Sequence, residues 1–130
     1  MNIEEYGIIL NVEKFDECVV FYKTLFNLPE MFSKIEGEFK LTCLKLGGAY
    51  LMIETEGTAV PNGKSIDQSA TALRFNISDL DKTLNQVQEY DPSAQIVEYD
   101  WGSVIRLFDP DGNRISIRDA EGFNRQARLD

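Results

Sequence analysis

The feature that most constrains the fold of this chain is an order of elements that occurs twice. Apolar periodicity and turn residues predict a strand at 6–12, a helix at 14–27 and strands at 31–35, 39–46 and 49–54. The order restarts with a strand at 70–77, a helix at 80–90 and strands at 95–99, 103–108 and 113–118. Val12 and Ile77 each close a first strand and lie about 65 residues apart. This spacing, close to half the chain, predicts a duplicated module.

The segments between and after the two modules show no periodicity. We therefore expect a single domain over residues 1–130, with module one at about 1–55, a connector at about 56–69 and module two at about 70–118. The polar tail, 119–130, is expected at the surface. The turn Asp109-Pro110-Asp111-Gly112 has a proline where φ is fixed and a glycine where positive φ is tolerated, so we expect it to join the last two strands as a hairpin.

Composition excludes several classes of function. The formal net charge of −9 repels a phosphate backbone, which argues against nucleic-acid binding. No apolar run approaches the roughly 20 residues of a membrane helix, and the first residues lack the pattern of a signal peptide. Cys18 and Cys43 both lie in apolar patterns and are expected to be buried free thiols. We expect a cytoplasmic protein without a membrane partner.

Several short motifs, in this order, resemble one known superfamily. They are Phe21-Tyr22 on the first helix, Ser78-Asp79-Leu80-Asp81 opening the second, Trp101-Gly102, and Phe108-Asp109-Pro110-Asp111-Gly112-Asn113. Together with the repeat they resemble the vicinal-oxygen-chelate superfamily, which includes glyoxalase I, extradiol dioxygenases, fosfomycin resistance enzymes and bleomycin resistance proteins. The resemblance implies an α+β fold in which two tandem βαβββ modules form a curved mixed sheet around a central cleft. It also implies a homodimer with a small-molecule ligand in the cleft.

The resemblance further implies a metal site, which this sequence does not support. In the superfamily, the metal ligands lie on cleft-facing positions of the first and fourth strands of each module. Side chains alternate between the two faces of a strand, so these positions can be identified here. The four superfamily ligand positions then fall on Gly7, Met52, Ala72 and Ser116, and the chain contains no histidine. None of these side chains is a good ligand for a divalent cation. We expect no metal and no cofactor, and Glu54 remains as a weak candidate for a catalytic carboxylate.

The same alternation predicts the residues that contact a ligand. They are Asn11, Tyr50, Met52, Glu54, Arg74, Asn76, Trp101, Ser116 and Arg118.

Each of these side chains also has a structural interpretation. Arg74, Arg114 and Arg118 are suited to a carboxylate or phosphate, but they can equally pair with Glu54, and Arg114 and Arg118 can reach past the strand end into water. Asn11 and Asn76 can bind a ligand or each other. Trp101 can stack on a planar ligand or cover a sheet edge or a subunit contact. Tyr50 and Met52 can form a pocket floor or the core.

These observations favour a metal-independent small-molecule binding protein of the glyoxalase/bleomycin resistance superfamily, which sequesters an antibiotic or a metabolite. The acidic surface favours a cationic planar ligand, whereas inward arginines favour an anionic metabolite. The alternative is an enzyme, a glyoxalase-like lyase or isomerase that uses Glu54 or an atypical metal site. A third hypothesis is an interaction module whose cleft is filled by its own side chains.

Overall fold

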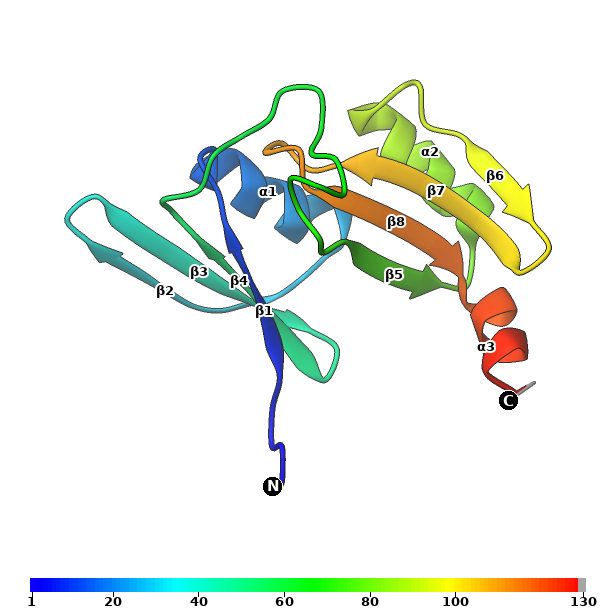
Figure 1. Ribbon diagram of the computed structural model, residues 1–130, viewed down its shortest axis with the longest axis horizontal. Helices are drawn as coiled ribbons and strands as arrows, with labels where there is room; N and C mark the ends of the chain where they lie inside the picture. The colour runs from blue at the N-terminus through cyan, green and yellow to red at the C-terminus, as the bar shows by residue number, and fades with distance from the viewer. Residues whose placement is uncertain (129–130) are drawn as a thin grey trace. The chain divides into compact units, whose positions relative to one another are not determined.

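The computed structural model describes residues 1–128, and its elements follow the predicted order. The first module contains β1 (Gly7–Asn11), α1 (Phe15–Leu25), β2 (Glu30–Glu36), β3 (Phe39–Leu46) and β4 (Ala49–Glu54). The second contains β5 (Leu73–Ile77), α2 (Leu80–Tyr90), β6 (Ile96–Tyr99), β7 (Gly102–Phe108) and β8 (Arg114–Asp119) (Figure 1). A third helix, α3 (Ala120–Arg128), follows β8. The α+β fold of two tandem βαβββ modules is confirmed.

Each module forms one four-stranded sheet with the same topology. The strand orders are β1-β4-β3-β2 and β5-β8-β7-β6. In both sheets the first and fourth strands are parallel, and the other neighbouring strands are antiparallel. The chain divides into two compact units. One comprises residues 1–62 with 110–112, and the other comprises residues 63–109 with the described residues from 113 onward.

The core of the first unit lies between α1 and its sheet. Cys18, Phe21 and Tyr22 are the buried positions of α1, and their i, i+3, i+4 spacing places them on one face of the helix. They pack with fully buried strand residues such as Leu51 and Ile53. Burial of such side chains contributes about 1.5–3 kcal/mol each. Cys18 and Cys43 are both buried free thiols, as predicted.

The N-terminus of α1 is stabilised by a carboxylate that lies far away in the sequence. Lys14, at the N-cap position, makes no side-chain cap. Asp111 instead accepts hydrogen bonds from the backbone N–H of Glu13 at 3.1 Å and of Lys14 at 2.8 Å, and it is fully buried. The sequence predicted the turn that contains Asp111 but not this role. A negative charge at a helix N-terminus is favourable because the first N–H groups have no intrahelical partner.

The second unit repeats this packing with its own helix cap. Leu80 and Val87 are the buried positions of α2. The Asp79 side chain accepts a hydrogen bond from the backbone N–H of Lys82 at 3.0 Å and so caps the N-terminus of α2. Ile105 and Ile117 are fully buried in the sheet. Among residues 1–128, no helix combines the length and apolarity that membrane crossing requires.

The C-terminal segment corrects the sequence analysis, which expected only a polar tail at 119–130. Residues 120–128 form α3, which contacts β5, β7 and β8 (Figure 1). The segment has few apolar residues, so no strong apolar stripe announced a helix. Its first turn is instead held by Asp119, whose carboxylate accepts a hydrogen bond from the backbone N–H of Gly122 at 2.7 Å. Leu129 and Asp130, the end of the predicted tail, lie outside the described residues.

Candidate functional site

Strand register sorts the side chains of each sheet onto two faces. In the first unit, Ile8, Leu10, Leu51 and Ile53 share the face that α1 covers. We call the opposite side the open face of the first sheet. It carries the positions that the alternation predicted to face the cleft: Gly7, Ile9, Asn11, Tyr50, Met52 and Glu54.

The open face of the second sheet, opposite α2, is rich in arginine. Register places Arg74, Ser116 and Arg106 side by side on β5, β8 and β7. The next row contains Asn76, Arg118 and Val104. Arg106 was missed by the sequence analysis because alternation was applied there only to the first and fourth strands of each module. The same alternation along β7 identifies it.

Two aromatic rings lie beside these arginines. Tyr99 and Trp101 stack with ring centroids 4.7 Å apart and an interplanar angle of 7°. The Arg118 guanidinium carbon lies 4.8 Å from the Trp101 ring centroid, and that of Arg74 lies 5.8 Å from it. Trp101 therefore packs against Tyr99, Arg74 and Arg118 of its own unit. The ring is well placed to report on changes at the arginines.

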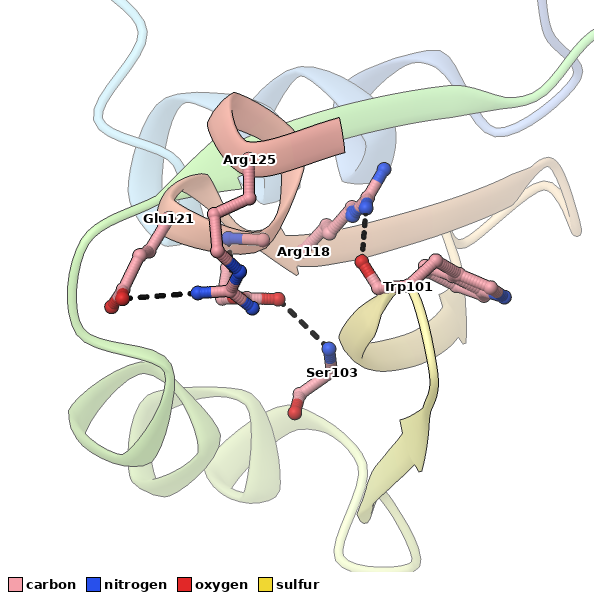
Figure 2. A network of polar contacts seen from close by, with 7 residues as sticks. Trp101, Ser103, Arg118, Glu121 and Arg125 are labelled. Atoms are coloured by element: carbon pink, nitrogen blue, oxygen red, sulfur yellow. Dashed lines mark hydrogen bonds and ion pairs between the residues drawn. The ribbon is translucent and has the colours of Figure 1, made fainter. Parts of the chain in front are cut away.

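Arg118 is a buried cation rather than a solvent-exposed strand end. Its residue is 3% exposed, because the Trp101 ring and the Phe123 ring of α3, at 5.6 Å, both pack against its guanidinium. Its Nη2 donates to the backbone oxygen of Trp101 (Figure 2). Its Nε has no hydrogen-bond partner among residues 1–128. The alternative that Arg118 reaches past the strand into water is wrong, because α3, which was not predicted, covers the side chain.

Arg74 and Arg106 are exposed, and each is held by one hydrogen bond. The Arg74 Nε donates to Ser116 Oγ at 2.6 Å, and the Arg106 Nη1 donates to the Tyr99 hydroxyl at 2.8 Å. Neither guanidinium forms an ion pair within the second unit, as far as its described residues extend. Desolvation and the charges of Arg118 and Arg106 lower the pKa of Arg74. Arginine nevertheless stays protonated near neutral pH.

Asp119 fixes the loop that carries Trp101. Its carboxylate accepts hydrogen bonds from the backbone N–H of Ser103 at 2.8 Å and of Gly122 at 2.7 Å, so it joins β7 to α3. The Ser103 bond is the largest cause that lowers the pKa of Asp119. Gly102 has a φ of 141°, and a Cβ there would lie 2.8 Å from the Asp119 carboxylate. The junction therefore requires a glycine at position 102.

Arg114 has a structural role in the second unit. It is half-buried on β8, and its Nη2 donates to the backbone oxygen of Ser69 at 2.9 Å. This bond ties the connector to the sheet. The alternative that Arg114 extends into water is therefore wrong.

The candidates on the first open face make fewer polar contacts. The Asn11 amide donates to the backbone oxygen of Thr55 at 3.1 Å. The Tyr50 ring lies over Gly7 so closely that a Cβ there would be 2.2 Å from the ring. Tyr50, Met52 and Glu54 are half-buried. The Glu54 carboxylate has no hydrogen-bond or ion-pair partner within the described first unit.

The donor groups at the superfamily metal positions do not fit a divalent cation. Gly7 and Ala72 offer no donor, and Met52 offers a soft thioether. The Ser116 hydroxyl already accepts a hydrogen bond from Arg74, in a cationic environment. Within residues 1–128, no group of three or more histidine, cysteine, aspartate or glutamate side chains is arranged to hold a metal ion. The residues present therefore do not fit the metal that the superfamily implies.

Two βαβββ units with these registers define a member of the vicinal-oxygen-chelate superfamily, and comparison of the sequence with family models agrees. Residues 6–121 match the family described as the glyoxalase-like domain. The chain belongs to this family. No curated protein matches the sequence.

Solved structures share the fold at low sequence identity. The trypanothione-dependent glyoxalase I of Leishmania major is 15% identical, with a TM-score of 0.76 over 98% of this chain and 94% of that one. The fosfomycin resistance protein FosX of Listeria monocytogenes, in complex with Mn(II) and sulfate, is 16% identical, with a TM-score of 0.71 over 92% and 93%. A glyoxylase/bleomycin resistance protein/dioxygenase domain from Frankia sp. EAN1pec is 12% identical, with a TM-score of 0.65 over 92% and 97%.

Proposed function

We propose that this protein is a metal-independent binding protein for a small organic anion, which Arg74 and Arg106 hold on the open face of the second sheet. The observation that carries the proposal is the state of these two guanidiniums. Both are exposed, both are oriented by a single hydrogen bond, and neither is neutralised by a carboxylate within the described second unit. Each guanidinium has five N–H donors, so most of them remain for a ligand.

The charge distribution favours an anion over the cationic planar ligand that the acidic composition first suggested. The net charge of −9 belongs to the whole chain, whereas the second open face gathers Arg74, Arg106 and Arg118. The mutual repulsion of these cations contributes to the lowered pKa of Arg74. An anion relieves this repulsion, and a cation increases it.

A matched pair of planar ligands tests the sign of the charge. Trp101 is the one tryptophan of the chain, so its fluorescence reports on this site alone. We expect benzoate to change the fluorescence saturably, with an affinity that falls as salt is added. Benzamidinium, which has a similar shape and the opposite charge, is expected to have no effect. Binding of benzamidinium, or of neither compound, would contradict the proposal.

Variants then test the residues. We expect Arg74→Gln combined with Arg106→Gln to weaken benzoate binding at least about tenfold, because two charge-assisted contacts are lost. Arg125→Gln is the matched control, since it removes the same charge from an exposed arginine that pairs with Glu121 on α3. An equal loss in the control would indicate a general charge effect and not a site.

A binding role is better supported than catalysis. Glu54 is the candidate general base, but no group within the described first unit forms a hydrogen bond or an ion pair with its carboxylate that could relay a proton. Sequestration of an anionic metabolite or antibiotic needs no such group. Metal analysis of the purified protein tests the enzymatic alternative. A stoichiometric metal ion that is lost in Glu54→Gln would overturn the metal-independent proposal.

We also propose a homodimer. The strand β2 is an edge of its sheet, and it exposes Met31, Phe32 and Ile35 at 50%, 48% and 70%. Exposed apolar edge strands are usually covered by a partner. Sedimentation equilibrium is expected to give twice the chain mass, and Ile35→Lys is expected to shift it toward the monomer.

A further inference from the structure

We infer that the ligand carries a dianionic head group of the phosphate monoester type, which Arg74 and Arg106 bind together across Ser116. This inference rests on the proposed function and names the class of its ligand.

The register supplies the geometry. Arg74 pairs with Ser116, and Ser116 pairs with Arg106, so the serine lies between the two arginines on one row of the sheet. Neighbouring strands are about 4.8 Å apart, so the two arginine backbones are separated by roughly 10 Å. Long side chains that start at this separation can both reach a compact group above the serine. A single head group can therefore contact both guanidiniums.

The uncompensated arginine charges indicate the charge of the ligand. Arg118 is buried, and Asp119 next to it in the sequence is close enough for the Arg118 charge to contribute to its lowered pKa. Arg74 and Arg106 have no carboxylate partner within the described second unit. Two positive charges therefore remain uncompensated on the exposed row. A monoanion neutralises one of them, whereas a dianion neutralises both.

The hydrogen-bond donors of the row indicate the shape of the ligand's head group. The Ser116 oxygen accepts the Arg74 Nε hydrogen bond, which leaves the serine hydroxyl hydrogen available to donate. The row thus offers a hydroxyl donor between two arginine residues. A tetrahedral phosphate presents three terminal oxygens to such a set, and a planar carboxylate presents two.

The composition of the chain makes pH a clean probe of ligand charge. A phosphate monoester changes from monoanion to dianion near pH 6, and the chain contains no histidine that titrates there. The charged and titratable side chains on β6, β8, α3 and the turn after β6 are Glu98, Tyr99, Asp100, Arg114, Arg118, Asp119, Glu121, Arg125 and Arg128. A sulfate monoester keeps one negative charge between pH 5 and pH 7, so it separates a change in the ligand from a change in the protein.

Phenyl phosphate and phenyl sulfate form the test pair, because they have nearly the same shape and sulfate stays monoanionic. Calorimetry and Trp101 fluorescence at pH 5 are expected to give similar affinities for both. At pH 7 we expect phenyl phosphate to bind about tenfold more tightly than phenyl sulfate, as one more charge-assisted contact provides. Equal affinities at pH 7 would overturn the inference.

Single variants locate the preference. Arg74→Gln and Arg106→Gln are each expected to abolish the pH 7 preference for phosphate while binding of phenyl sulfate weakens less. Arg125→Gln is expected to keep the full preference. A preference that survives either site variant would contradict joint binding by the two arginines. If benzoate binds the wild type but phosphate is not preferred, the inference fails and the proposed function stands. If no anion binds, the proposed function fails.

Discussion

The two units place different chemistry on the same backbone positions. The row Ile9, Met52 and Cys43 on the first open face corresponds by register to Arg74, Ser116 and Arg106 on the second. In the next row, Asn11 and Glu54 correspond to Asn76 and Arg118. The helix-facing positions are mostly apolar in both units, because each helix must pack against its sheet. The two units therefore share one scaffold, and their open faces differ in charge.

The largest difference in stability is expected between variants of Arg118 and of Glu54, which occupy corresponding positions in the two units. Arg118→Ala removes a buried side chain that contacts two rings and the Trp101 oxygen, so we expect a loss of about 3 kcal/mol in the free energy of unfolding. Glu54→Ala is expected to cost less than about 0.5 kcal/mol. Urea denaturation measures both. Similar losses in the free energy of unfolding for the two variants would contradict the proposed difference between the two open faces.

The turns that lead into β3 and β7 allow the backbone constraints of the two units to be compared. Gly37 and Gly102 both have positive φ, but only at Gly102 would a Cβ meet another group, the Asp119 carboxylate. We expect Gly37→Ala to cost about 1 kcal/mol and Gly102→Ala about 2 kcal/mol. Thermal unfolding of the two variants checks the order. A larger loss at Gly37 would show that the Trp101 loop is not held by the Asp119 junction.

A third prediction concerns pH and belongs to the second unit alone. Because the pKa of Asp119 is lowered in the folded protein, its carboxylate stabilises the fold above the ordinary carboxyl pKa. This contribution is lost as the pH falls through the lowered value. We expect Asp119→Asn to cost about 1 kcal/mol at pH 7, as for a lost helix cap, and less at pH 2 to 3. A pH-independent difference between wild type and variant would refute the role of the charge.

The last prediction concerns the solvent accessibility of the row Ile9, Met52 and Cys43 on the first open face, and it requires no substitution. Burial, and then the charge of Glu5, raise the pKa of the Cys43 thiol. We expect both cysteines to react with a thiol reagent at pH 8 at least about tenfold more slowly than in urea. Rapid reaction of Cys43 in the native protein, identified by mass spectrometry of the labelled peptide, would show that this row is as open as the row containing Arg74.

Much of this molecule was predictable because its signals are local. The bounds 39–46, 49–54 and 80–90 agree with β3, β4 and α2, since each has strong periodicity and turn residues or a cap at its ends. The division of β1 and β4 into two faces follows from alternation alone. The segment 120–128 was missed because α3 depends on a cap from Asp119 and on contacts with the sheet, and not on a pattern of its own.

The candidate site was only partly predictable, for a related reason. Alternation identified Arg74, Ser116 and Arg118 as sharing one face. It did not show which arginine is buried, because the Phe123 ring that packs on Arg118 comes from the unforeseen helix. Nor did it show that Tyr99 orients Arg106, because this bond joins two strands whose register no local pattern specifies.

The amino-acid sequence by itself determined the duplicated module, the apolar helix-facing positions and the absence of suitable donors at the superfamily metal positions, because these depend on residue type and on periodicity. Only the tertiary structure decided which cations are buried and which are exposed, that Asp111 caps α1, and that Asp119 joins β7 to α3. These properties arise from contacts between residues distant in the chain, and the energy of a charged group depends on what surrounds it in space.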